Sequence, residues 1–157
     1  MKDLELITNI KVKAYDELDD TERRLCELAI QATAGSYAPY SHFNVGAAIL
    51  LDNSEIVTGA NQENVAYPSG TCAERSACFY AGAKYPEARF VMIAVAAKNS
   101  SGELTPLPTA PCGACRQALL EYEMRSGHDV PVLLAGRDCV YRLESVHSLL
   151  PLSFTEF

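Results

Sequence analysis

Two short stretches of this sequence combine metal-ligand residue types with a proton-transfer residue. The first spans residues 71–75 and contains Cys72 and, two positions later, Glu74; the second is a Pro-Cys-x-x-Cys motif that supplies Cys112 and Cys115. Structural zinc sites are usually closed by four protein ligands, whereas catalytic sites keep one position for water. Three cysteines beside one glutamate therefore predict a catalytic zinc site with one Zn2+ ion per chain.

Glu74 also has an interpretation without chemistry, because Thr71 and Glu74 have the spacing of a helix capping box. A closed structural site that uses Cys78 is a second alternative, but Cys78 lies two helical turns beyond Cys72 and could not easily reach the same ion. The distant Cys-x-x-Cys pair favours catalysis, with Glu74 taking a proton from water and passing protons to a substrate. Thr71 alone could still cap the helix.

Composition favours one globular domain that acts on a small molecule. The chain has 157 residues, of which 48% are hydrophobic and 21% are charged. Its formal net charge of -7 disfavours a nucleic-acid partner, because neutralising phosphates requires clustered Lys and Arg. The N-terminus does not resemble a signal peptide, and no apolar run of about 18 residues predicts a membrane span. We therefore expect a cytoplasmic protein whose cysteines do not form disulfides.

The spacing of apolar residues predicts alternating strands and helices. A loose alternation over residues 4–15 suggests an edge strand, and Asp19 with Glu22 forms a plausible capping box for a helix that ends near Gly35. The apolar run 90–97 predicts a strand that is buried on both faces in the middle of a sheet. The other predicted elements are strands over residues 43–51, 56–60, 132–135 and 140–143, helices over 72–84 and 111–125, and a short helix over 145–150.

This order of elements predicts an α/β fold. We expect a single three-layer α/β/α domain over residues 1–157, with a mixed sheet of about five strands. The sheet would begin antiparallel and become parallel, because helices separate the later strands. Helices are expected on both faces of the sheet.

The residues around the cysteines resemble those of the small homotetrameric cytidine deaminases, which are of a three-cysteine zinc type. The resemblance lies in Cys-Ala-Glu at 72–74 with Pro-Cys-x-x-Cys at 111–115, in the run 40–47, in Asn61-x-Glu63-Asn64 with Tyr67-Pro68, and in Cys-Arg-Gln at 115–117. It covers residues 20–154 and leaves residues 1–19 as an N-terminal extension. It implies the cytidine deaminase fold and the zinc-dependent hydrolytic deamination of cytidine and 2'-deoxycytidine, a reaction of pyrimidine salvage.

The resemblance also implies roles for individual residues. Glu74 would be the catalytic acid and base, and Arg75 would donate hydrogen bonds to the zinc thiolates of Cys72, Cys112 and Cys115. The implied substrate contacts are Asn61 and Glu63 with the ribose hydroxyls, Phe43 with the nucleoside, and the backbone of Ala73 with the base.

A homotetramer is implied as well, in which Phe154 reaches the site of a neighbouring subunit.

Two other functions stay open: deamination of another aminated heterocycle by the same site, and a zinc-stabilised interaction domain without catalysis, which would need a fourth protein ligand. Cys72 stands where the nucleic-acid and nucleotide deaminases have histidine, which favours a free nucleoside. A nucleic-acid editing enzyme fits the acidic composition least.

Overall fold

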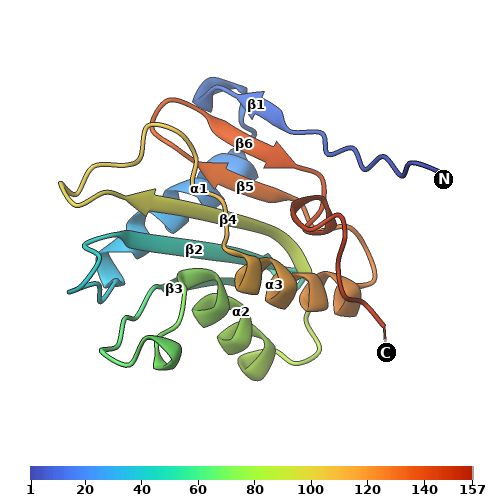
Figure 1. The fold of residues 1–157 in the computed structure, drawn as a ribbon. Coiled ribbons are helices and arrows are strands. Elements are labelled where there is room, and N and C mark those ends of the chain that lie inside the picture. The colour runs from blue at the N-terminus through green and yellow to red at the C-terminus, as the bar shows by residue number, and fades with distance from the viewer. Residues whose placement is uncertain (157) are drawn as a thin grey trace.

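A six-stranded mixed sheet forms the centre of the computed structural model, which describes residues 1–156 (Figure 1). The strands follow the order β1-β6-β5-β4-β2-β3 across the sheet. The strands are β1 (Lys11–Lys13), β2 (Asn44–Leu51), β3 (Ile56–Ala60), β4 (Phe90–Lys98), β5 (Val132–Ala135) and β6 (Val140–Leu143). The helices are α1 (Asp20–Ala32), α2 (Ala73–Lys84) and α3 (Gly113–Ser126), with 3-10 turns at Tyr15–Glu17, Thr33–Gly35, Tyr67–Ser69 and His147–Leu149.

The sheet begins antiparallel and becomes parallel between β4 and β5, as predicted, but β6 then returns antiparallel to β5. Strands β2 and β3 form an antiparallel hairpin, and β4 runs antiparallel to β2 on its other side. Strand β5 is parallel to β4, and α3 makes the crossover between them. The mixed sheet is confirmed, with six strands instead of about five, because β1 adds an antiparallel edge strand beside β6.

Helices cover both faces of the sheet, as expected. Helix α1 lies behind the sheet in Figure 1, and α2 and α3 lie side by side in front of it. Strand β4 contributes to both cores: Ile93 and Val95 pack with α2 and α3, whereas Ala94 and Ala96 pack with α1. The prediction of a doubly buried central strand is therefore confirmed.

Local differences concern element ends. The alternation over residues 4–15 produces a strand only at Lys11–Lys13, and the helix expected from residue 111 begins at Gly113. The predicted capping box of α1 is present, with Asp19 accepting a hydrogen bond from the Glu22 amide at 2.8 Å. Thr71 does not cap α2, because the N-cap position is occupied by Cys72.

A buried carboxylate joins the N-terminal extension to the rest of the domain. Glu22 is 3% exposed and accepts from Lys13 Nζ of β1 at 2.5 Å and from Arg142 Nε of β6 at 2.7 Å. Burial raises the pKa of Glu22, but the bonds from Lys13 and Arg142 outweigh it and hold the pKa below its usual range. The short strand β1 is thus held to the domain by the ion pair between Lys13 and Glu22 as well as by its backbone pairing with β6.

Close backbone contact holds the first turn of α2 against β3. A Cβ atom placed on Gly59 would lie 2.6 Å from the carbonyl oxygen of Ala73 and 2.6 Å from the amide nitrogen of Ala77. Neither backbone atom could move without shifting the first turn of α2. Glycine at this position of β3 therefore places Cys72 and Glu74 relative to the sheet.

We expect Gly59→Ala to destabilise the protein by roughly 1–3 kcal/mol, because the added methyl overpacks a backbone contact. Gly113→Ala is the matched control at the start of the other helix, since a Cβ there meets nothing within 4 Å. Urea unfolding followed by circular dichroism would compare the two midpoints. Equal midpoints for the two variants would contradict the role given to Gly59.

Candidate metal and catalytic site

Three cysteine side chains meet where α2 and α3 begin. Cys72 is the N-cap residue of α2, Cys112 is the N-cap residue of α3, and Cys115 lies in the first turn of α3. Neither N-cap residue makes a side-chain capping bond, so both thiols are available for another partner. Unpaired amide groups and the helix dipole favour a thiolate at each of these positions.

The distances among the three sulfur atoms fit one zinc ion. Cys72 Sγ lies 4.0 Å from Cys112 Sγ, Cys112 Sγ lies 3.6 Å from Cys115 Sγ, and all three lie within 4.8 Å of one another. Tetrahedral zinc with bonds of about 2.3 Å requires sulfur atoms about 3.8 Å apart. Within residues 1–156 the group contains three ligands, which leaves the fourth position to water or substrate.

The alternative fourth ligand, Cys78, is directed elsewhere. It is fully buried, and its thiol donates a hydrogen bond to the carbonyl oxygen of Arg75 at 3.6 Å. Burial raises the pKa of Cys78 to about 12, which disfavours the thiolate that a metal requires. A closed site with four cysteines is therefore not supported.

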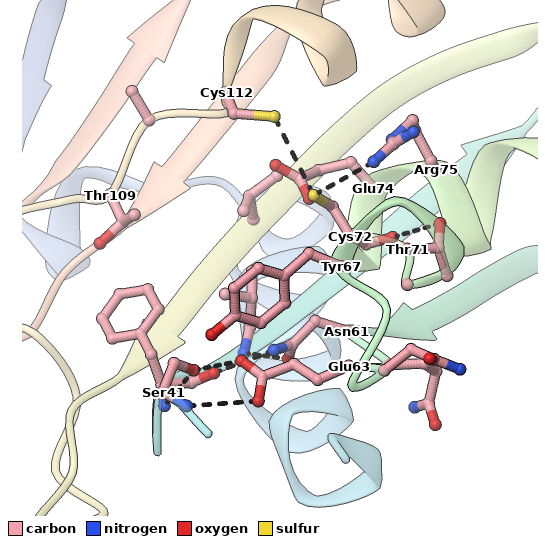
Figure 2. Close-up of a pocket in the computed structure, with 17 residues that line it drawn as sticks. Ser41, Asn61, Glu63, Tyr67, Thr71, Cys72, Glu74, Arg75, Thr109 and Cys112 are labelled. Atoms are coloured by element: carbon pink, nitrogen blue, oxygen red, sulfur yellow. Dashed lines mark hydrogen bonds between the residues drawn. The ribbon is translucent and has the colours of Figure 1, made fainter. Parts of the chain in front are cut away.

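Arg75 supplies positive charge to the cysteine cluster. Its Nη2 donates to Cys72 Sγ at 3.6 Å, and its Nε is buried with no hydrogen-bond partner in the described part of the chain (Figure 2). An arginine in this place offsets the negative charge of three thiolates around a divalent ion. The contact with Cys72 raises the pKa of Arg75, so the guanidinium stays charged.

The cluster already favours one thiolate before any cation binds. A hydrogen bond from the Cys115 thiol is the largest cause that lowers the pKa of Cys72 to about 5, ahead of the contact with Arg75. The same bond to Cys72, together with burial, raises the pKa of Cys115. Zinc binding would therefore release the protons held by the remaining thiols.

Beside the cluster a cavity of about 410 Å³ opens to the surface. Glu74 lies next to Cys72 in its wall, and Glu63 lies near Ser41 (Figure 2). Glu74 is 4% exposed, and burial raises its pKa. The lining residues are Ser41, Phe43, Val45, Asn61, Gln62, Glu63, Asn64, Tyr67, Gly70, Thr71, Cys72, Glu74, Arg75, Val95, Thr109, Ala110 and Cys112.

Asn61 and Glu63 hold the loop that enters β2. The Asn61 side chain accepts from the Val45 amide at 2.8 Å and donates to the Phe43 carbonyl at 2.9 Å. Glu63 accepts from the Tyr40 amide at 2.9 Å. Both side chains line the cavity while these bonds fix their orientation.

Most of the residues expected at the site meet around this cavity. Phe43, Asn61, Glu63 and Glu74 line it together with Cys72, Cys112 and Arg75, and buried Cys115 adjoins it through its contact with Cys112. The two other expected substrate contacts are placed differently.

Ala73 is fully buried and is not among the lining residues of the described chain. Phe154 is 63% exposed and is not among the residues that line this cavity, and its carbonyl accepts from Gln117 Nε2 at 2.8 Å. Sequence reasoning gave no role to Ser41 and Thr109. Ser41 lies inside the matched run 40–47, which was the available signal, whereas Thr109 lies in a loop without a pattern.

Comparison with known proteins identifies the family. Residues 19–127, more than half of the chain, match the family described as the cytidine and deoxycytidylate deaminase zinc-binding region. The chain therefore belongs to the cytidine deaminase family of zinc-dependent enzymes.

Individual relatives agree with this assignment. A cytidine deaminase of Halalkalibacterium halodurans is 40% identical over 131 residues, which cover 83% of this chain and 92% of the relative. The crystal structure of a cytidine deaminase from Burkholderia pseudomallei superposes with a TM-score of 0.69 at 37% identity, covering 83% of this chain and 97% of that one. The Mycobacterium tuberculosis cytidine deaminase superposes with a TM-score of 0.66 at 33% identity, covering 88% of this chain and 100% of that one. In each of these comparisons the likeness covers at least 83% of this chain.

Purified protein is expected to contain about one zinc ion per chain, measured by elemental analysis. Cys115→Ser should remove most of it, because a neutral hydroxyl replaces one of three thiolates. Cys139→Ser, which lies outside the cluster, is the matched control and should keep the full zinc content. A Cys115→Ser protein with the same zinc content as the control would show that the ion is held elsewhere.

Proposed function

We propose that this chain catalyses the hydrolytic deamination of cytidine and 2'-deoxycytidine at C4 of the base, giving uridine or 2'-deoxyuridine and ammonia. The proposal is supported by membership of the family and by the arrangement of Glu74 beside the three cysteines. The relatives from Halalkalibacterium halodurans and Mycobacterium tuberculosis carry the name cytidine deaminase. Water is the second reactant, so no further cofactor is required beyond the metal.

The observation that carries the proposal is a buried carboxylate in the wall of an open cavity, next to a three-thiol group. A zinc ion held by Cys72, Cys112 and Cys115 would supply Lewis-acid activation of water. Glu74 takes a proton from the attacking water and delivers it to N3 of the base as the water oxygen bonds to C4. It then takes the remaining proton from that hydroxyl group and gives it to the amine, which leaves as ammonia when the bond between C4 and the amine nitrogen breaks. Its burial excludes bulk water from these transfers.

The sugar is placed by the opposite part of the cavity. Glu63 and Asn61 bind ribose hydroxyls, and Phe43 packs against the nucleoside. The backbone of Ala73, in the first turn of α2, contacts the base. The base thus lies near Glu74 and the sugar near Glu63.

Glu74→Gln should keep about one zinc ion per chain but reduce turnover of cytidine by at least roughly 100-fold, because glutamine cannot accept and return a proton. The fall in ultraviolet absorbance as cytidine becomes uridine measures the rate. Glu87→Gln is a control of the same chemical type on an exposed turn away from the cavity, and it should retain normal activity.

Two results would separate the parts of this mechanism. Near-normal turnover by the zinc-loaded Glu74→Gln protein would remove Glu74 from the reaction. Loss of zinc together with activity would mean that Glu74 supports the metal site. The loss of activity would then follow from the missing metal and would contradict the role given to Glu74 in proton transfer alone.

The charge of the cavity favours nucleosides over nucleotides. Its acidic and basic lining residues, leaving aside the cysteines and Tyr67, are Glu63, Glu74 and Arg75. Arg75 is directed toward Cys72, so within the described chain the lining offers two carboxylates and no separate cation for a phosphate. A 5'-phosphate would be repelled by these carboxylates, and no free Lys or Arg side chain in the lining of the described chain would donate a hydrogen bond to it.

Cytidine 5'-monophosphate should therefore be deaminated with a kcat/KM at least about tenfold lower than that of cytidine. Parallel assays at low and high salt would check the cause, since screening should narrow the difference between the two substrates. A kcat/KM for the nucleotide that equals that of cytidine would contradict the assignment of this chain to free nucleosides.

We also propose a single domain over residues 1–157 that acts in the cytoplasm as a homotetramer, with Phe154 reaching a neighbouring subunit's cavity. Large apolar side chains are exposed on the isolated chain, among them Phe79 of α2 and Met124 of α3, which would be covered by association. Within residues 1–156 no helix is long and apolar enough to cross a membrane.

A further inference from the structure

Glu63 is held by a compact turn that comes directly before β2. The amide of His42 donates to the carbonyl of Ala38 at 3.0 Å, and His42 has a positive φ of 55°. Few residues other than glycine adopt this conformation, so the turn has a defined shape that its other contacts must stabilise. The turn presents Ser41 to the cavity, where Figure 2 shows it beside Glu63.

Ser41 is the centre of the contacts between the turn and Glu63. Its hydroxyl donates to Glu63 Oε1, and its own amide donates to Glu63 Oε2 at 3.3 Å. The same hydroxyl oxygen accepts from the Phe43 amide at 3.1 Å. Because that amide can only donate, the single hydroxyl proton of Ser41 is left for Glu63.

Counting acceptor positions shows what Glu63 has left for a ligand. An ionised carboxylate offers about four lone-pair positions. The amides of Tyr40 and Ser41 occupy both positions on Oε2, and the Ser41 hydroxyl occupies one on Oε1. One acceptor position therefore remains on Oε1 among the contacts of the described chain, and its direction is set by the Ser41 hydroxyl.

The same contacts keep Glu63 ionised. The hydrogen bond from the Ser41 hydroxyl is the largest cause that lowers the pKa of Glu63, followed by the bond from the Tyr40 amide. An ionised carboxylate with one free position is an acceptor for one hydroxyl group of a ligand. It cannot donate a hydrogen bond.

We propose that Ser41 is a positioning residue for sugar recognition, which orients Glu63 so that its one free acceptor position meets a hydroxyl of the nucleoside sugar. Ser41 acts through Glu63 and not on the reacting atoms. The inference rests on the proposed function, because it takes Glu63 as a sugar contact. It adds a residue from a turn that lies outside the cysteine cluster.

A comparison of two substrates tests this role. Cytidine carries the sugar hydroxyls, and 2',3'-dideoxycytidine keeps the ring and the base but lacks both secondary hydroxyls. Ser41→Ala should lower kcat/KM for cytidine by about 10- to 100-fold, because a charge-assisted hydrogen bond is lost and Glu63 is free to turn. The same variant should change kcat/KM for 2',3'-dideoxycytidine by less than about threefold, because that substrate does not use Glu63.

Two further variants serve as controls in the same assay. Ser41→Thr keeps the hydroxyl and should restore most of the discrimination between the two substrates. Ser69→Ala removes an exposed serine hydroxyl that is not among the lining residues of the cavity, and it should leave both rates unchanged.

The outcomes are distinguishable. An equal loss with both substrates in Ser41→Ala would show a merely structural role, and no loss with either would also overturn the proposal. Failure of the unaltered protein to deaminate cytidine would instead reject the proposed function. Equal rates of the unaltered protein with both substrates would reject Glu63 as a sugar contact, and the role of Ser41 with it.

Discussion

The site depends on one constraint: the first turns of two helices must meet closely enough for three sulfur atoms to share one ion. Cys72 and Cys112 are 40 positions apart in the chain, and each occupies an N-cap position. The sheet supplies this convergence, because α2 rests on β3 through Gly59 and α3 forms the crossover between parallel strands. Both N-cap thiols lie at the positive ends of helix dipoles, which favour the negative charge of a thiolate ligand.

The cavity contains two carboxyl groups, those of Glu74 and Glu63, whose surroundings differ. Glu74 is buried beside the cysteines, and burial raises its pKa, whereas hydrogen bonds from Ser41 and Tyr40 lower the pKa of partly exposed Glu63. Two carboxylates in one cavity with oppositely shifted pKa values are suited to different tasks, proton transfer and hydrogen-bond acceptance. Arg75 supplies the positive charge near the thiols and is not free to attract a phosphate.

Much of the fold could be predicted because its signals are local. The apolar run of β4, the hairpin of β2 and β3 and the capping box of α1 each lie within a few residues. The pairing of β1 with β6 could not be predicted, since their partner residues lie far apart in the chain. It depends on ion pairs that converge on Glu22, which the sequence showed only as a capping residue.

The site was predictable where residue type and spacing were sufficient, as for the three cysteines. Ser41 was not, although it lies in the recognised run. Serine in a loop is common, and its importance comes from a turn with positive φ at His42 that brings its hydroxyl to Glu63. Nothing in the local pattern states which distant carboxylate that hydroxyl will meet.

The start of α2 shows how a single residue of register separates a structural role from a chemical one. With Thr71 as the cap, Glu74 would occupy the third helical position, from which a glutamate reaches back to the cap amide. Because the helix instead begins after Cys72, Glu74 occupies the second helical position and lines the cavity. A serine or aspartate at the N-cap would use its side-chain oxygen to accept a hydrogen bond from the helix backbone. The Cys72 thiol makes no such bond and is free to bind a metal. A cysteine at the cap therefore leaves both the Cys72 thiol and the Glu74 carboxyl available to the site, and the close contact at Gly59 holds this first turn against β3.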